Sequence, residues 1–243
     1  MTQVSIIGYG NVGSQLHRAF EAAGIRVSHI LRRNLSEGEN GIFTDRFEDL
    51  PKNQLAIVAI PDDHISELID WVPDEMPIVY TSGSIQLKDV RKNRQVGVFY
   101  PLQTFTKDGE VEFNKVPILI EAADDSFRSQ LIKLGNRISS RVEEMSSEDR
   151  KRLHLAAVWV NNFTNHMNTI AKDIMTSYDL DYSLLLPLLQ ETSRKIAVNG
   201  PKDSQTGPAK RGDQGVIEEH LRMLDNEKAA LYKLITDHIQ KNG

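Results

Sequence analysis

Three glycines near the start of the chain have the types and spacing to bind a phosphate-bearing ligand. The apolar run Val4-Ser5-Ile6-Ile7 precedes a Gly-x-Gly-x-x-Gly pattern, and apolar residues at helical spacing follow. In such a turn the glycines let the chain leave a strand sharply, approach a pyrophosphate closely, and pack the following helix on the sheet. The amides at the helix N-terminus then attract phosphate. The pattern predicts a dinucleotide site rather than an empty tight turn, with contacts from Gly8, Gly10, Asn11, Val12 and Gly13.

The end of the next expected strand indicates which dinucleotide is bound. The apolar run at 25–31 ends in Arg32, Arg33 and Asn34, with no acidic residue beside them. Proteins that bind NAD place an acidic residue near this point to accept hydrogen bonds from the adenosine ribose. Guanidinium groups instead bind a 2′-phosphate in a bidentate manner. The sequence therefore favours NADP over NAD, the alternative being two solvated surface arginines.

Polar residues also stand in three later turns, each directly after an expected strand. Ligands of open α/β sheets bind beyond the carboxyl ends of the strands. We therefore expect Ile60 and Pro61 to border the cofactor, and Asp62 or Asp63 to cap the helix that follows. Ordinary turn chemistry would explain the same residues without a ligand. The substrate contacts expected from the other two turns are Ser82, Gly83, Gln103 and Thr104.

A long helix expected after residue 146 has a polar stripe. At about 100° per residue, one side of this helix presents His154, Asn161, Asn165, Asn168 and Lys172. Asparagine and histidine are weak helix formers that suit a face making directed hydrogen bonds. We expect the stripe to face a cleft, with His154 and Asn161 as catalytic candidates and Asn165 as a substrate contact. Of the residues in this stripe, only His154 has a side chain that can act as an acid or base near neutral pH, although a lone histidine on a helix is more often structural.

The loop from Thr206 to Asp213 is the last candidate. Its glycines and Pro208 define the backbone path, and Arg211 has the chemistry to bind an anionic substrate or a cofactor phosphate. Asp213 is expected to cap the next helix. The alternative is a capped interhelical turn with Arg211 in a surface salt bridge.

Composition restricts the class of protein. The 243 residues have a net charge of -5 and no cysteine. The charge argues against a nucleic-acid binder, and disulfides, zinc–thiolate sites and thiol nucleophiles are excluded. We expect no metal site. The sequence has no recognisable signal peptide and no apolar run of membrane-spanning length, so a cytoplasmic protein acting on a small molecule is expected.

Strands alternate with helices up to about residue 145, and only helices are expected afterwards. This order predicts an α/β fold, a Rossmann-like doubly wound and mainly parallel sheet followed by an all-α domain. The expected domains are 1–145 for NADP binding and 146–243, a helical domain for substrate binding. Strands are expected near 4–7, 25–31, 41–44, 55–60, 78–81, 96–100, 116–121 and 141–145, and later helices near 146–178, 182–198, 216–224 and 227–241.

Four segments together resemble a bacterial family that joins a Rossmann-like domain to a C-terminal helical domain of unknown function. They are 6–13, 100–105, 154–163 and 206–213, of which the Gly-Pro-Ala-x-Arg-Gly-Asp loop is the most specific. That family is similar to pyrroline-5-carboxylate reductase, 6-phosphogluconate dehydrogenase and the 3-hydroxyacid dehydrogenases. The resemblance implies NAD(P) use, a homodimer formed through the helical domain, and a substrate contact at Ser82-Gly83.

The chain departs from these relatives at two positions. In the hydroxyacid dehydrogenases a catalytic lysine lies four residues before an asparagine. If that asparagine corresponds to Asn162, the position of the lysine is occupied by Val158 here. Asn162 itself is expected to contact the substrate. The histidine usual before the Pro-Leu pair is Tyr100 here, which becomes a catalytic candidate beside His154. The expected function is an NADP-dependent oxidoreductase for a small carbonyl, imine or hydroxy acid. The alternatives are a non-catalytic sensor or scaffold dimer, and a different ligand such as a deazaflavin.

Overall fold

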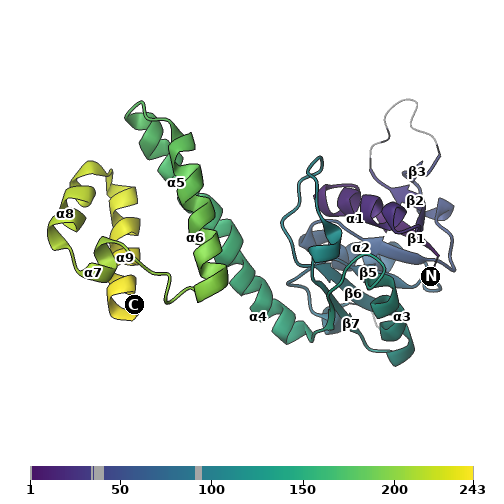
Figure 1. The fold of residues 1–243 in the computed structure, drawn as a ribbon. Helices are drawn as coiled ribbons and strands as arrows, with labels where there is room; N and C mark the ends of the chain where they lie inside the picture. Colours follow the sequence, from purple (N-terminus) through teal and green to yellow (C-terminus); the bar gives the residue numbers. More distant parts are fainter. Residues whose placement is uncertain (1, 34, 36–40, 91–94, 243) are drawn as a thin grey trace. The chain divides into compact units, whose positions relative to one another are not determined.

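The structure is a computed structural model that describes residues 2–33, 35, 41–90 and 95–242 (Figure 1). The chain divides into two compact units, Met1–Asn161 and Asn162–Gly243. The first unit therefore includes helix α4 (Ser147–Ala157), beyond the domain boundary expected near residue 146. Arg150 of this helix is buried, which explains why α4 belongs with the sheet.

The first unit is built on an eight-stranded sheet in the order β3-β2-β1-β4-β5-β6-β7-β8. Neighbouring strands run parallel except β6 and β7, which are antiparallel. The predicted doubly wound, mainly parallel sheet is confirmed. The strands are β1 (Gln3–Ile7), β2 (Arg26–Leu31), β3 (Phe43–Thr44), β4 (Leu55–Val58), β5 (Ile78–Tyr80), β6 (Val96–Pro101), β7 (Ile118–Ala122) and β8 (Val142–Glu144).

Helices cover both faces of this sheet. On one face α1 (Asn11–Ala22) and α3 (Asp125–Gly135) pack through Phe20 and Phe127 against strand residues such as Ile6. On the other face α2 (Ile65–Trp71) packs against the side of the sheet that holds Tyr80 and Val98. Alternate strand residues thus enter two separate cores, as expected for strands with period-two side chains. The short 3₁₀ turns are η1 (Phe47–Asp49), η2 (Asp62–His64), η3 (Leu87–Asp89) and η4 (Phe113–Lys115).

The expected helix from 146 to 178 is present but is not uniform. Ser146 caps it, accepting a hydrogen bond from the Asp149 amide at 3.2 Å. Between α4 and α5 (Thr164–Ser177) lies a π-helical segment, η5 (Val158–Phe163). A π turn holds more residues than an α turn. The stripe from His154 to Lys172 assumed α-helical spacing throughout, so the prediction of one continuous stripe is wrong.

The second unit is helical throughout its regular structure, as predicted. Pro187 lies in the first turn of α6, where a proline costs no hydrogen bond. Among the described residues of this unit only Ile217 and Thr236 are buried. No described helix of the chain has the length and apolar character to cross a bilayer. The elements are α5, η6 (Tyr182–Leu185), α6 (Leu186–Asn199), α7 (Pro208–Arg211), α8 (Gln214–Met223) and α9 (Asn226–Asn242).

Candidate functional site

The glycine-rich turn joins β1 to α1 as predicted. Gly8 has φ +98°, and a Cβ there would overlap the Ala59 carbonyl; one at Gly13 would overlap the Gly8 carbonyl. At Gly10, by contrast, a Cβ would meet no described atom within 4 Å. Gly10 is also the N-cap of α1 without any side-chain cap hydrogen bond, so no capping side chain competes with an anion for the first amides of the helix. Asn11 and Val12 form this first turn. The turn therefore fits a pyrophosphate.

The predicted 2′-phosphate residues lie just past β2. Arg32 is half-buried with its guanidinium 4.9 Å from the centre of the Phe43 ring, and Arg33 is exposed. Phe43 in turn meets Tyr9 of the glycine turn edge to face at 5.2 Å. An arginine held on an aromatic face beside the turn suits a phosphate and an adenine. Asn34, the third predicted residue, lies outside the described residues.

Asp62 joins two of the predicted turns. Its carboxylate accepts a hydrogen bond from the Ser82 hydroxyl at 2.8 Å and another from the Ser84 hydroxyl. The Ser82 oxygen also accepts from the Ile85 amide at 3.1 Å. The expectation that Asp62 or Asp63 caps a helix is wrong, because Pro61 is the N-cap of η2 and Asp62 lies inside it. The aspartate instead fixes the turn after β5.

Gly83 allows Tyr100 and His154 to meet above that turn. The Tyr100 hydroxyl lies 3.0 Å from Nδ1 of His154, and the rings meet edge to face at 6.1 Å. A Cβ at Gly83 would lie 2.6 Å from His154 Nδ1 and 2.9 Å from Tyr100 Cζ. The glycine is therefore required by close packing. The structure thus brings three predicted site residues, from three separate segments, into contact.

The surroundings of Tyr100 favour its neutral form. Burial raises the pKa of the phenol, the Asp62 carboxylate raises it further, and Arg150 opposes both. A neutral phenol has a proton to donate across the physiological range. Next to the pair, a cavity of ≈ 630 Å³ is lined by His154, Leu155, Val158, Ser84 and Gln86, among others. This volume falls in the range of small-molecule sites.

The remaining site candidates of the first unit make none of the described contacts with the Tyr100–His154 pair. Ile60 is half-buried and Pro61 exposed at the end of β4, and the Ile60 side chain lies against Gly8. Gln103 and Thr104 are exposed, and the Gln103 side chain accepts a hydrogen bond from the Thr104 amide at 2.9 Å. Asn161 is exposed in the π segment. None of these three polar residues touches the Tyr100–His154 pair in the described contacts.

The other predicted residues belong to the second unit. Asn162 and Asn165 are exposed. Asn168 is structural, because it accepts a hydrogen bond from the Tyr182 hydroxyl at 3.1 Å and donates one to the Thr164 carbonyl. Arg211 pairs with Asp213 at 2.7 Å. Asp213 is the N-cap of α8, as expected, but its side chain makes no cap hydrogen bond.

Sequence reasoning missed Arg150 and Glu121. Arg150, at the start of α4, forms an ion pair with Glu121 of β7. The alternation of β7 gave one signal, since Glu121 interrupts an otherwise apolar strand. Nothing in the sequence indicated that Arg150, among the charged residues of a capped helix, would be the buried one.

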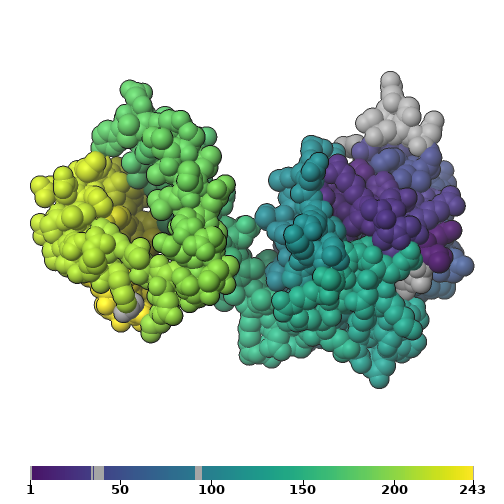
Figure 2. All heavy atoms as spheres, viewed as in Figure 1, coloured from purple at the N-terminus to yellow at the C-terminus, as the bar shows by residue number. Residues whose placement is uncertain are grey.

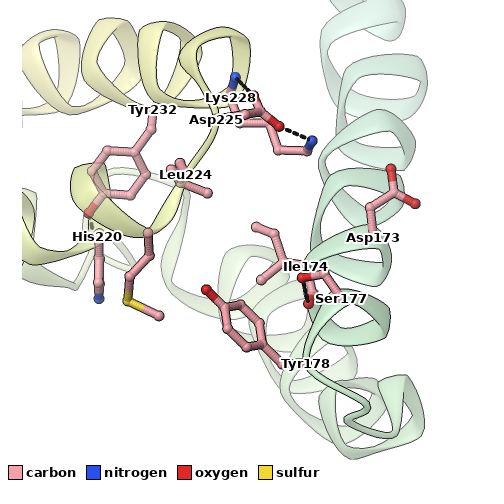
Figure 3. Close-up of a pocket in the computed structure, with 10 residues that line it drawn as sticks. Asp173, Ile174, Ser177, Tyr178, His220, Leu224, Asp225, Lys228 and Tyr232 are labelled. Carbon is pink, nitrogen blue, oxygen red and sulfur yellow. Dashed lines mark hydrogen bonds and ion pairs between the residues drawn. The ribbon is translucent and has the colours of Figure 1, made fainter.

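The second unit contains a cavity of its own, ≈ 390 Å³ (Figure 3). Figure 3 shows Ile174 and Tyr178 on one side and Leu224 and Tyr232 on the other. Tyr232 and His220 share a hydrogen bond of 2.9 Å. Figure 2 shows this unit hollowed between its green and yellow helices. The lining of the cavity in Figure 3 is mainly apolar and contains no predicted site residue.

The chain is similar to several proteins of known structure. It is 35% identical to the "putative NADP oxidoreductase BF3122" of Bacteroides fragilis, over 99% of this chain and 98% of that one, with a TM-score of 0.90. An imine reductase from Myxococcus stipitatus, in complex with NADP⁺, is 15% identical over 98% of this chain and 92% of that one (TM-score 0.68). Plasmodium falciparum pyrroline carboxylate reductase, with NADP bound, is 10% identical over 99% and 100% (TM-score 0.63). The last two show the fold alone.

No curated protein matches the sequence. The profile of the family described as "Domain of unknown function (DUF2520)" matches residues 116–239, which is more than half of the chain. The resemblance inferred from the motifs is confirmed. The chain belongs to the DUF2520 family, with a Rossmann-like N-terminal fold and a helical C-terminal part.

Proposed function

We propose that this protein is an NADP-dependent oxidoreductase acting on a small carbonyl, imine or hydroxy-acid substrate. The observation that carries the proposal is the meeting of Gly83, Tyr100 and His154 at the carboxyl ends of β5 and β6. The same sheet begins with the glycine-rich turn, whose open amides fit a dinucleotide. The name of the Bacteroides fragilis relative gives further support.

The cofactor would be held by the β1–α1 turn, with Arg32 and Arg33 at the 2′-phosphate and Ile60 and Pro61 beside it. The half-buried Arg32 stacked on Phe43 supports NADP over NAD. Bound NADPH would supply a hydride to the substrate carbon. The chain's own residues would orient the substrate and provide the proton for its oxygen or nitrogen.

His154 and Tyr100 would handle that proton. Because Nδ1 of His154 is bonded to the Tyr100 hydroxyl, Nε2 is the other nitrogen able to exchange a proton. Tyr100 would fix the orientation and tautomer of the ring. It would pass its hydroxyl proton to Nδ1 as Nε2 gives one up, and would then regain a proton from solvent. Ser82 and Ser84, held by Asp62, would bind polar substrate groups. Asn161 remains a proposed catalytic residue. Asn162, Asn165, Gln103, Thr104 and Arg211 remain proposed substrate contacts.

We also propose that residues 146–243 act in substrate binding and dimerisation, and that two copies form a homodimer through the second unit. A single copy of this unit buries almost none of its apolar side chains. Leu188 and Leu234, for example, are 64% and 68% exposed. Helices with such faces are stable when another surface covers them, and obligate homodimers resemble a core cut in half.

The test is a titration with NADPH and NADH followed by a substrate screen that monitors NADPH absorbance. We expect tighter binding of NADPH, and an Arg32→Ala/Arg33→Ala variant that loses about tenfold or more in NADPH affinity while NADH binding changes little. Preference for NADH would contradict the cofactor assignment. NADPH binding without turnover of any carbonyl, imine or hydroxy acid would instead support the non-catalytic sensor.

A further inference from the structure

Arg150 lies buried one helical turn before His154. Its side chain is 1% exposed and forms an ion pair with Glu121, which is 20% exposed. Its guanidinium also donates a hydrogen bond to the Ile85 carbonyl, just after the Ser82–Ser84 turn. A buried charge is stable only when it is paired and hydrogen-bonded. Arg150 therefore has one fixed position.

Ser147 connects the same partners. Its hydroxyl lies within hydrogen-bond distance of both Glu121 carboxylate oxygens, at 2.9 and 2.7 Å. The Ser147 oxygen accepts a hydrogen bond from the Leu87 amide at 2.9 Å. The first turn of α4 is thus bound at once to β7 and to the segment after β5.

The strand register places this cluster beside Tyr100. Glu121 of β7 lies opposite Val98 of β6, so the two side chains share one face of the sheet. Tyr100 is two residues further along β6 and lies on that face too. Tyr80 of β5 pairs with Val98 on the same side and donates a hydrogen bond to the Ile85 carbonyl at 3.4 Å.

We propose that Arg150 and Glu121 are a positioning pair that holds α4 against the sheet, so that His154 meets Tyr100, and that the Arg150 charge makes Tyr100 a better proton donor. The catalytic consequence rests on the proposed function, whereas the structural and electrostatic effects do not. Neither residue is expected to touch the substrate.

The charges around Tyr100 support the electrostatic part. Asp62 of η2 raises the pKa of the phenol, and Arg150 of α4 lowers it. His154 on α4 contacts Tyr100 directly, and Tyr80 on β5 and Glu121 on β7 are titratable groups on the same face of the sheet. Removing the arginine charge therefore leaves burial and Asp62 unopposed, and the pKa of Tyr100 rises.

The test is the titration of Tyr100 in the protein without cofactor, by NMR of ¹³C-labelled tyrosine and histidine. Tyr100→Phe and His154→Ala identify the two resonances. We compare wild type with Arg150→Met/Glu121→Gln, which removes both charges and leaves neither one unpaired. In the double variant we expect the Tyr100 titration to shift to higher pH and the His154 ring resonances to lose their coupling to Tyr100. Turnover is expected to fall about 100-fold with little change in KM, because misplacing a catalytic group acts on kcat.

Two further variants serve as controls. Arg141→Met removes an exposed ion pair with Glu143 and is expected to leave the Tyr100 titration unchanged. Arg150→Lys keeps the charge and is expected to recover most of the shift. An unchanged Tyr100 titration and His154 resonance in the double variant would overturn the proposal, as would an equal shift in Arg141→Met. If the Tyr100 titration shifts but the protein never turns over NADPH, the positioning role of Arg150 and Glu121 is supported and the proposed oxidoreductase activity is contradicted.

Discussion

The Tyr100 hydroxyl lies 3.0 Å from Nδ1 of His154, although the two residues are 54 positions apart in the chain. Tyr100 stands at the end of a buried strand and His154 on a helix that the sheet holds through Arg150. Gly83 packs against both side chains and leaves no room for a Cβ. This contact connects the proposed acid–base pair to the sheet that would hold the cofactor.

Replacing either partner of this contact should lower turnover while leaving NADPH binding intact. His154→Ala removes the proposed proton donor, and we expect kcat to fall by about 10²–10⁴-fold. Tyr100→Phe removes only the hydroxyl, so kcat should fall less than in His154→Ala if the role of Tyr100 is to orient the His154 ring. Steady-state kinetics with fluorescence titration of NADPH makes both measurements. An unchanged kcat in His154→Ala would remove this residue from the mechanism.

Two glycines of the β1–α1 turn should differ in what they do. Gly10→Ala meets open space at φ −83°, which alanine adopts readily, so stability should change by less than about 0.5 kcal/mol. NADPH affinity should nevertheless fall about tenfold or more, because the methyl group occupies the phosphate concavity.

Gly13→Ala is the matched comparison for Gly10→Ala. Its Cβ would overlap the Gly8 carbonyl, so urea unfolding should show a loss of about 1–3 kcal/mol. Equal NADPH affinity in Gly10→Ala and wild type would mean that the turn binds no phosphate.

Gly83→Ala should separate Tyr100 from His154. The added methyl would lie 2.6 Å from Nδ1, so the histidine or the tyrosine must move. We expect a loss of about 1–3 kcal/mol in unfolding free energy and a fall in kcat comparable to that of Tyr100→Phe. The combined variant Gly83→Ala/Tyr100→Phe provides the check. If its kcat falls by the product of the two single effects, the two residues act independently.

Tyr100 should also affect stability at alkaline pH. Its folded pKa is raised, mainly by burial, so above about pH 10 the unfolded chain loses this proton before the folded one. The stability contributed by the neutral phenol is present below the unfolded pKa and is lost as pH rises toward the folded pKa. Tyr100→Phe should therefore lose stability less steeply above about pH 10. Tyr178→Phe, at an exposed position, is the control, and equal slopes in all three proteins would contradict the assignment.

The exposed helical faces of the second unit should make the protein dimeric in solution. Leu188→Glu or Leu234→Lys should weaken the dimer, seen by sedimentation velocity, and make the thermal midpoint depend more strongly on concentration. Trp71→Glu provides a control, because Trp71 is 71% exposed in the first unit. A monomeric wild type at micromolar concentration would be inconsistent with this proposal.

The sequence by itself determined the features that depend on local pattern. Glycine spacing predicted the β1–α1 turn, and continuous apolar runs such as 55–60 predicted buried parallel strands, of which β4 covers Leu55–Val58. The change from strands to helices after 145 predicted the two-part fold. Such features depend on steric needs and periodicity within a few residues of chain, so they can be read without knowing what lies nearby in space.

Other features of the protein depend on contacts between distant segments of the chain, and only the tertiary structure decided them. The π-helical segment at 158–163 interrupts the stripe expected from His154 to Lys172. Local helix propensity did not predict this segment. Asp62 was expected to cap a helix, but its carboxylate instead accepts hydrogen bonds from the hydroxyls of Ser82 and Ser84. Arg150 became buried because Glu121 and Ile85 come within reach of it only in the folded sheet. The energy of a buried charge depends on its partners, and those partners are brought together by strand order rather than by neighbouring sequence.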